Sequence, residues 1–166
     1  MTLKAPSLNG TTLERELPGV SSFEVSAIPL DQIEKRQIIQ WEDLHRRVLE
    51  PNAYLSPDFV VSLESHVPSK KKIWILNVQN PWEKNLAGLA VFEECRASRR
   101  FPFPHLQAYK SSQSYLTGML VAQEYESEVL EAIASFLWRN RFRWFGVKFQ
   151  DLHWEGRLAC ALRDLE

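Results

Sequence analysis

Three strand-like runs stand between two helical blocks, and this order constrains the fold more than any other feature of the sequence. The runs cover residues 71–79, 86–97 and 114–121. The segment "NPWEKN" between the first two is typical of a hairpin loop, because it separates two apolar runs with turn-forming residues. Strands placed in this way predict an α/β (α+β) domain, in which a mixed sheet carries helices on both faces.

The first helical block begins with a helix between Asp31 and Pro51. Asp31 is expected to cap this helix, and Pro51 to end it, since proline disfavours helical backbone in the residue before it. Apolar residues recur every three or four positions along the helix, which predicts a single buried face. That face consists of Ile38, Trp41, Leu44 and Val48.

A second helix in the same block has a clear start signal. Ser56 is the predicted N-cap, Pro57 takes the first helical position, and Asp58 lies near the positive end of the helix dipole. The helix is expected to stop at Pro68. Its predicted apolar stripe consists of Phe59, Leu63 and Val67.

The remaining segments complete one domain, predicted at residues 23–166, with the element order β-α-α-β-β-β-α-β-α. A first strand is expected at residues 23–30, a bent connection with two prolines at 98–113, a further strand at 142–152 and a last helix at 154–166. The long helix after residue 121 has a predicted buried face of Val129, Leu130, Ile133, Phe136 and Leu137. Residues 1–22 are rich in Gly, Ser, Thr and Pro, which predicts a flexible N-terminal arm.

Length, charge and cysteine content narrow the class of protein. A chain of 166 residues is enough for one domain, and its net charge of −1 gives no overall basic field, so we expect no DNA partner. No apolar run reaches the roughly 18 residues of a membrane span, and residues 1–22 lack the apolar core of a signal peptide. Cys95 and Cys160 are far apart in the sequence and are expected to be reduced, which indicates a cytoplasmic protein.

Metal-site and nucleophile motifs are absent from the sequence. No two histidines are spaced as H-x-x-x-H, neither cysteine belongs to a C-x-x-C pair, and there is no G-x-S-x-G elbow. Cys95 directly follows Glu93 and Glu94, whose charges make it a poor nucleophile. We therefore predict no metal site and assign no catalytic residue.

Two basic stretches, "PSKKKIW" and "ASRRFPFPH", leave two interpretations open. If the two adjacent strands pair, five basic residues become neighbours: Lys70, Lys71, Lys72, Arg99 and Arg100. Phe101 and Phe103 would add aromatic rings to a basic edge suited to RNA. The alternative is that the lysines only protect the end of a sheet from edge-to-edge pairing. The overall neutrality of the chain favours this second interpretation.

Four segments in sequence order carry a family resemblance: "WEDLHRRVLEPNAYLSPDFVVSL", "LAGLAVFEE", "SYLTGMLVAQEYESEVLEAIASFL" and "WFGVKFQDL". Together with the element order, they resemble the GNAT acyltransferases. Within that superfamily they are most similar to the CelD-type and FemABX-like branch, which is built from two tandem GNAT-like halves. The resemblance covers residues 23–166 and implies a largely antiparallel central sheet.

The segment "VAQEYESEV" lies where catalytically competent GNAT domains carry a glycine-rich "Q/R-x-x-G-x-G/A" pattern. Those glycines let backbone N–H groups approach the pyrophosphate of coenzyme A at a helix N-terminus. Residues 121–129 of this chain contain no glycine, arginine or lysine, and place Glu124, Glu126 and Glu128 beside the first helical turn. These carboxylates suit the helix dipole but repel a pyrophosphate, so we expect this chain to bind no cofactor.

The tandem architecture of the resembled branch implies a division of labour. There the second half generally holds the donor, acyl-CoA or aminoacyl-tRNA, and the first half shapes the acceptor cleft. We therefore interpret the chain as the N-terminal half of an acyltransferase acting on a small-molecule or peptide amine or hydroxyl, with the C-terminal half as its partner. RNA is expected as a partner only if the donor is aminoacyl-tRNA.

Residues at strand ends and in the loop between the first two helices are the candidates for contacting the acceptor, because that loop borders the acceptor site in GNAT folds. They are Asn52, Tyr54, Tyr115, Gln123, Gln150 and His153. A second interpretation stays open for His153, that of a loop histidine beside a helix cap. A second interpretation also remains for the whole chain, as a non-catalytic degenerate GNAT domain that binds another protein.

Overall fold

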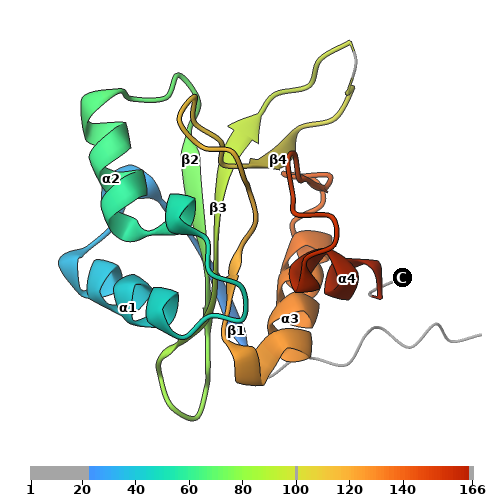
Figure 1. Cartoon of the computed structure of the whole chain (residues 1–166). Coiled ribbons are helices and arrows are strands. Elements are labelled where there is room, and N and C mark those ends of the chain that lie inside the picture. Colours follow the sequence, from blue (N-terminus) through green and yellow to red (C-terminus); the bar gives the residue numbers. More distant parts are fainter. Residues whose placement is uncertain (1–22, 100, 165–166) are drawn as a thin grey trace, which may run out of the picture.

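The computed structural model describes residues 23–99 and 101–164, so the predicted arm at residues 1–22 lies outside the described residues. Along the described residues, two helices follow the first strand, and a run of strands separates them from the later helices (Figure 1). Their bounds are β1 Glu24–Pro29, α1 Lys35–Arg46, α2 Pro57–His66, β2 Ile73–Gln79, β3 Leu86–Cys95, β4 His105–Ala108, β5 Leu120–Val121, α3 Glu126–Arg139, β6 Val147–Lys148 and α4 Arg157–Arg163.

Six strands form one sheet in the described part of the chain. Their order across the sheet is β1-β2-β3-β4-β6, and β5 pairs with β3 farther along the same edge as β4. Among these six strands, only the pair β4 and β6 is parallel. The predicted mixed, largely antiparallel sheet is therefore confirmed.

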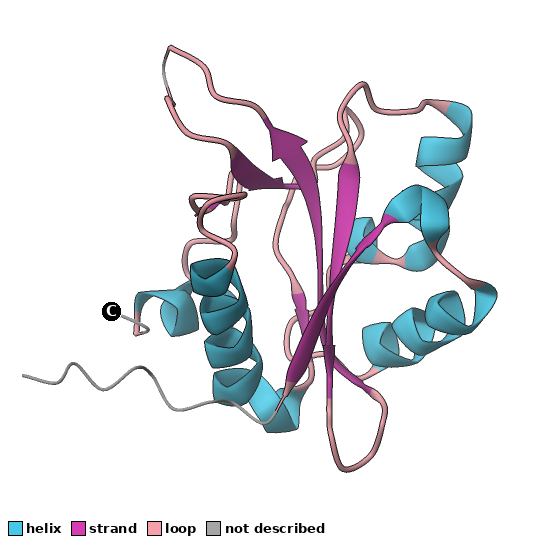
Figure 2. Ribbon diagram, turned by 180° about the vertical axis from the view of Figure 1, so that it is seen from behind, coloured by secondary structure: helices cyan, strands magenta, loops and turns pink. Residues whose placement is uncertain are grey.

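Helices cover both faces of this sheet, as predicted (Figure 2). On one face α1 and α2 bury Trp41, Leu44 and Val60 against alternate residues of β2 and β3. On the other face α3 buries Val129 and Ile133 in a second core, to which α4 contributes Leu158.

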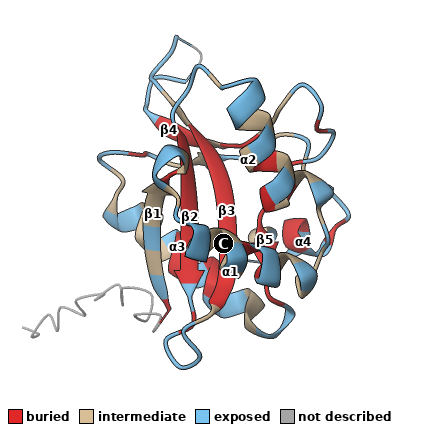
Figure 3. Ribbon diagram, turned by 90° about the vertical axis from the view of Figure 1, so that its left-hand side faces the viewer, coloured by how far each residue is buried: buried red, intermediate tan, exposed pale blue. Residues whose placement is uncertain are grey.

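The hairpin of β2 and β3 is the centre of the molecule, and its prediction from the sequence is confirmed. Nearly every residue of the two strands is buried (Figure 3). A strand that is covered on both faces reads as a continuous apolar run, because both sets of alternating side chains face a core. This explains why "IWILNV" and "LAGLAVF" lack the polar alternation of a half-exposed strand.

The first helix begins and ends at other residues than the sequence predicted. Asp31 lies in a single 3₁₀ turn, and Glu34 caps α1 through a reciprocal capping box with Gln37. The helix ends at Arg46, well before Pro51, and Val48 lies beyond it in an extended segment. Glu34 rather than Asp31 caps α1 because the two side chains of the capping box satisfy two N-terminal N–H groups at once.

The start of α2 agrees with the prediction, whereas its buried face does not. The Ser56 hydroxyl accepts a hydrogen bond from the Phe59 N–H at 3.2 Å, and Pro57 occupies the first turn. Val60, rather than Val67, is fully buried, and Val67 is 64% exposed. The helix ends at His66, so Val67 is its C-cap and no longer follows the helical period.

The strand predicted at residues 114–121 is shortened, and an additional short strand precedes it. β4 lies within residues 98–113, predicted as a connection, and β5 keeps only two residues of the strand predicted at 114–121. Both pair antiparallel with β3, β4 near its end and β5 near its start. The Tyr109 N–H still donates to the Val91 carbonyl of β3 at 2.9 Å, after which the chain leaves the sheet, and we call residues 109–119 the excursion. The structure therefore contains one strand more than the predicted order.

The C-terminal elements are also shorter than predicted. The strand expected at residues 142–152 shrinks to β6, since residues 141–143 form a turn after α3. The last helix, expected from residue 154, begins at Arg157. Both cysteines are free thiols, and within residues 23–99 and 101–164 no helix has the length and apolarity to cross a membrane.

Candidate acceptor site and helix-terminus site

Three segments meet beside β5, and we call them the loop cluster: residues 47–56, the excursion 109–119, and residues 150–156. The Thr117 N–H donates to the Asp151 carbonyl at 3.1 Å, and the Thr117 hydroxyl donates to the Gln150 carbonyl. Lys110 also forms an ion pair with Asp151. Five of the six residues predicted to contact the acceptor lie in this cluster: Asn52, Tyr54, Tyr115, Gln150 and His153.

Aromatic and amide side chains mark the part of the cluster formed by the loop between α1 and α2. The rings of Tyr54 and Tyr115 meet edge to face with centroids 6.2 Å apart, and the Tyr115 side chain is 80% exposed. The Asn52 Oδ1 accepts a hydrogen bond from the Tyr54 N–H at 3.1 Å. His45 Nε2 donates to the Asn52 carbonyl at 3.0 Å, because a carbonyl only accepts. These contacts fix the backbone around Asn52 and leave the Tyr115 ring open to solvent.

A carboxylate that the sequence analysis did not single out ties the cluster to α4. One oxygen of Glu50 lies 3.1 Å from His153 Nδ1, and the other accepts the Leu158 N–H at 3.3 Å. Glu50 therefore holds His153 and the first turn of α4 together across more than a hundred residues of sequence. Its position next to Pro51, in the loop expected to border the acceptor, is the sequence feature from which its place in the cluster could have been predicted.

The free edge of β5 is covered by the chain itself. The Leu49 N–H donates to the Val121 carbonyl at 2.8 Å, and Val48 forms an antiparallel bridge with Ala122. Gln123, the sixth predicted residue, follows this bridge in an exposed 3₁₀ turn. None of the hydrogen bonds described for the loop cluster involves the Gln123 side chain.

A second group of polar side chains, not predicted from the sequence, lies on the face of the sheet covered by α1 and α2. Tyr109 donates its hydroxyl to Glu64 at 2.9 Å, and Lys71 Nζ donates to Glu93 at 2.6 Å. We call these four residues the polar network. Glu93 lies on the same face of β3 as the buried residues Leu89 and Val91, because alternate residues of a strand share a face. A charged residue at such a position is the sequence feature that could have predicted this network.

Two residues of the polar network hold their protons firmly. Burial, together with the hydrogen bond to Glu64, raises the pKa of the Tyr109 phenol well above its usual range. Partial burial lowers the pKa of Lys71, but the hydrogen bond and charge of Glu93 outweigh it and raise the pKa above its ordinary value. At neutral pH the phenol of Tyr109 and the ammonium group of Lys71 therefore both stay protonated and act as hydrogen-bond donors.

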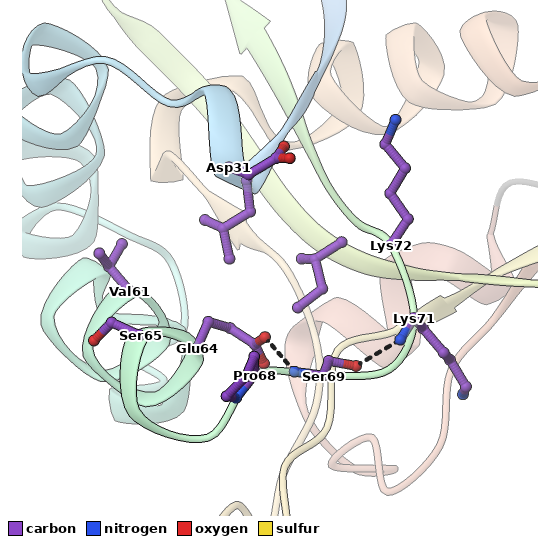
Figure 4. A pocket seen from close by; sticks show the side chains of 10 residues that line it. Asp31, Val61, Glu64, Ser65, Pro68, Ser69, Lys71 and Lys72 are labelled. Carbon is purple, nitrogen blue, oxygen red and sulfur yellow. Dashed lines mark hydrogen bonds between the residues drawn. The ribbon is translucent and has the colours of Figure 1, made fainter.

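A cavity of about 380 Å³ adjoins the polar network between α2 and the start of β2 (Figure 4). Glu64 turns inward, where Oε2 accepts the Ser69 N–H at 2.7 Å, and the Ser69 hydroxyl accepts the Lys71 N–H at 3.2 Å. The Lys71 side chain points away from this cavity, toward Glu93. Glu64 is thereby fixed on both of its oxygens.

Comparison with known proteins identifies the architecture. No model of a known protein family matches the sequence, and no curated protein matches it. Among solved structures, the chain is similar to the ribosomal-protein-alanine N-acetyltransferase from Brucella melitensis biovar Abortus 2308, with a TM-score of 0.51 and 13% sequence identity over 87% of this chain and 89% of that chain. This chain has the GNAT fold. A GNAT family acetyltransferase from Staphylococcus aureus subsp. aureus USA300_TCH1516 also matches, with a TM-score of 0.46 and 9% identity over 80% of this chain and 90% of that chain.

In this GNAT fold the N-terminus of α3 carries acidic rather than glycine-rich sequence. Glu124 lies in the preceding 3₁₀ turn, and Glu126 and Glu128 lie in the first turn of α3. Glu126 forms an ion pair with Arg157 of α4 at 3.0 Å. A cavity of about 450 Å³ adjoins this terminus, and its lining includes the carboxylates of Glu126, Glu131 and Asp164 with the single guanidinium of Arg157. The electrostatics of this terminus therefore oppose an anionic ligand.

No cluster of three or more potential metal ligands occurs in the portion of the chain that the structure describes. None of the six predicted acceptor residues lines the cavities beside α2 and α3. Their role as acceptor contacts thus stays a prediction, based on their grouping in the loop cluster.

Proposed function

We propose that this chain is the acceptor-side GNAT domain of an acyltransferase, which transfers an acyl or aminoacyl group to an amine or hydroxyl. The observation that carries the proposal is the contrast between the fold and the start of α3. The fold supports acyl-transfer chemistry, while the carboxylates around the α3 N-terminus oppose the diphosphate of coenzyme A. Donor binding is accordingly assigned to another part of the complete protein.

The electrostatic cost of a diphosphate at this terminus supports the proposal. A carboxylate 6–8 Å from a phosphate costs about 2 kcal/mol per charge pair at an effective dielectric near 20, before screening by salt. Glu124, Glu126 and Glu128 lie within the turns that would face the anion. Arg157 offsets part of this charge through its ion pair with Glu126. The exposed carboxylate of Glu124 then still opposes what a helix N-terminus contributes to anion binding.

The occupied edge of β5 gives the proposal a second support. Its outer carbonyl, at Val121, is already bonded to the Leu49 N–H at 2.8 Å. An extended donor molecule would have to displace Val48 and Leu49 to hydrogen-bond along this edge. We therefore place the donor in a C-terminal GNAT-like half, as in the CelD-type and FemABX-like enzymes that the sequence resembles.

The chemistry assigned to this chain is alignment of the acceptor. Acyl transfer from a thioester or ester needs the acceptor nucleophile held close to the carbonyl carbon, and positioning alone lowers the barrier substantially. Asn52, Tyr54, Tyr115, Gln150 and His153 would line the acceptor side, with Gln123 at its border. Glu50 would act as a positioning residue, because it holds His153 at 3.1 Å.

Calorimetry with acetyl-CoA tests the donor part of the proposal. We expect no measurable binding by this chain at ligand concentrations up to about 1 mM, which corresponds to roughly −4 kcal/mol. The variant Glu124→Gln/Glu126→Gln/Glu128→Gln should bind more tightly than the native chain, because it removes the repulsion. Its control is Glu42→Gln/Asp43→Asn/Asp58→Asn, which makes the same change in charge on α1 and α2. A micromolar Kd for the native chain would refute the assignment of the donor to another domain.

Kinetics of the complete protein test the acceptor part. Asn52→Ala should lower kcat/KM for the acceptor at least about tenfold while leaving donor affinity unchanged, because it perturbs only the acceptor loop. Gln32→Ala, an exposed substitution in the turn before α1, serves as the control. Equal losses for donor and acceptor in the Asn52 variant would contradict the division of roles.

Exposed aromatic side chains favour a second candidate function, a protein-interaction module without catalysis. Trp138, Phe142 and Phe145 are exposed near the end of α3, and Phe145 stacks on Phe103 with ring centroids 4.3 Å apart. Large exposed rings of this kind are typical of binding surfaces. A complete protein that binds no acyl donor and transfers no acyl group would favour this module over the enzyme.

A further inference from the structure

An open groove at one end of the sheet concentrates positive charge. Its volume is about 1060 Å³, and it lies between the start of β2, the connection from β3 to β4, and β6. This connection projects from the sheet beyond the helices (Figure 1). Five cationic side chains line the groove: Lys70, Lys71, Lys72, Arg96 and Lys148.

Most of these cations are not neutralised by the protein. Lys71 pairs with Glu93, but within the described residues the other four form no ion pair. The groove lining includes one carboxylate, Glu94, whose Oε2 accepts the Trp74 indole N–H at 2.8 Å. The whole chain has a net charge of −1, so this charge is a local feature. A polyanion would find complementary charge here and nowhere in the cavity beside α3.

Aromatic rings accompany the charge. Phe101 lines the groove and is 38% exposed, and its ring packs on His105 with centroids 4.3 Å apart. Phe103, next but one along the connection, is also exposed. Exposed rings beside a basic groove are the features that bind unpaired bases, because a base stacks on an aromatic face while cations follow the phosphates.

We propose that this groove binds a single-stranded segment of nucleic acid, with phosphates on Lys70, Lys72, Arg96 and Lys148 and a base stacked on Phe101. The Lys148 side chain lies opposite Gln107 on the parallel pair β4 and β6, so an amide also reaches the groove for hydrogen bonding. A duplex keeps its bases stacked inside and would offer nothing to Phe101. The inference is independent of the proposed acyl transfer, because none of the proposed acceptor residues lines the groove.

Fluorescence anisotropy with a labelled eight-nucleotide oligouridine tests the proposal. We expect a Kd below about 100 µM at 50 mM salt, and a plot of log affinity against log salt with a slope near −2.8, from four phosphate contacts at about −0.7 each. Duplex RNA of the same length should bind at least tenfold more weakly. Oligothymidine should bind with similar affinity if the base and phosphate carry the recognition, and a large preference for RNA would assign a further contact to the ribose hydroxyl.

Matched variants separate this site from general charge attraction. Arg96→Gln and Lys148→Gln should each weaken binding severalfold and reduce the salt slope by about 0.7. Phe101→Leu should weaken binding at least about fivefold without changing the slope, because it removes stacking and no charge. Lys35→Gln, an equal change of charge at the exposed start of α1, should leave both quantities unchanged. Thermal unfolding of each variant verifies that it is folded.

Several results would overturn the proposal. One is a Kd above about 1 mM at 50 mM salt, because such binding is weaker than ordinary non-specific binding to nucleic acid. Another is equal weakening by the Lys35 and Lys148 variants, or no effect of Phe101→Leu. Competition by an octaglutamate peptide at the same concentration as the oligonucleotide would instead assign the groove to an acidic protein segment.

Discussion

Gly88 lies where α3 crosses β3, and a side chain there would have no room. A Cβ at this position would overlap Cγ1 of Val129 and lie 3.3 Å from Cγ2 of Val78. Val129 is fully buried and β-branched, so its side chain has no alternative rotamer that clears the space easily. We predict that Gly88→Ala lowers the free energy of unfolding by about 1–3 kcal/mol, the usual cost of overpacking.

Urea denaturation measures this effect, and Gly146→Ala is the control, because a Cβ at Gly146 would meet no atom within 4 Å. The double variant Gly88→Ala/Val129→Ala should cost less than the sum of the two single changes, since the second removes the overlap. A Gly88 variant as stable as the Gly146 variant would contradict the close contact between α3 and β3.

The polar network gives the stability of the protein a pH dependence at alkaline pH. The native pKa values of Tyr109 and Lys71 lie above their ordinary values of 10.0 and 10.5, so the unfolded chain loses these protons first as pH rises. The stability from both groups is complete below about pH 10 and is lost as pH rises through their native pKa values. We predict a steeper alkaline fall in unfolding free energy for the native protein than for Tyr109→Phe.

Urea denaturation at a series of pH values between 8 and 12 measures this slope. Lys71→Met should flatten it as well, whereas Lys35→Met, at an exposed position on α1, should not. Identical slopes for the native protein and both network variants would show that the two groups titrate as they do in the unfolded chain.

At the scale of a single element, α2 depends on its N-cap. The Ser56 hydroxyl satisfies the Phe59 N–H, one of the N–H groups that a helix leaves without an internal partner. We predict that Ser56→Ala lowers the unfolding free energy by about 1 kcal/mol and that Ser56→Asp retains it. Ser65→Ala, at the exposed end of the same helix, is the control in chemical denaturation. Equal losses for the alanine and aspartate variants at position 56 would exclude capping as the cause.

Elements defined by local signals were predictable from the sequence, and elements defined by distant contacts were not. The N-cap of α2 and the apolar runs of β2 and β3 are read from neighbouring residues. β4 was missed because Pro102 and Pro104 precede it, although a proline just before the first strand residue is compatible with pairing. β5 is shorter than predicted because Thr117 bonds to residues 150 and 151 instead of to β3.

For the molecule as a whole, the sequence predicted the architecture better than the candidate site. The layers follow from amphipathic periodicity. The GNAT resemblance guided the choice of six candidate residues, and five of them lie in one loop cluster. The contact between Glu50 and His153, and that between Glu64 and Tyr109, join residues 103 and 45 positions apart. Neither pair has a spacing signal, because only the tertiary fold brings its members together.

Local stability should differ strongly between the central strands β2 and β3 and the edge of the sheet that carries β6 and the excursion. β2 is paired on both sides and β3 is paired with three strands, while β6 pairs only with β4 among the described strands and Lys148 is exposed. Amides in buried, doubly paired strands exchange only through global unfolding, whereas those at a short edge exchange through local opening.

We predict that peptides from β2 and β3 exchange hydrogen most slowly, and that peptides from the excursion and β6 exchange at least about a hundredfold faster. Mass spectrometry of hydrogen exchange measures both rates in one experiment, with peptides from α3 as an internal reference for a packed helix. If the excursion were as protected as β3, residues 109–119 would open only with the whole domain, and the loop cluster would be too rigid to adapt to an acceptor.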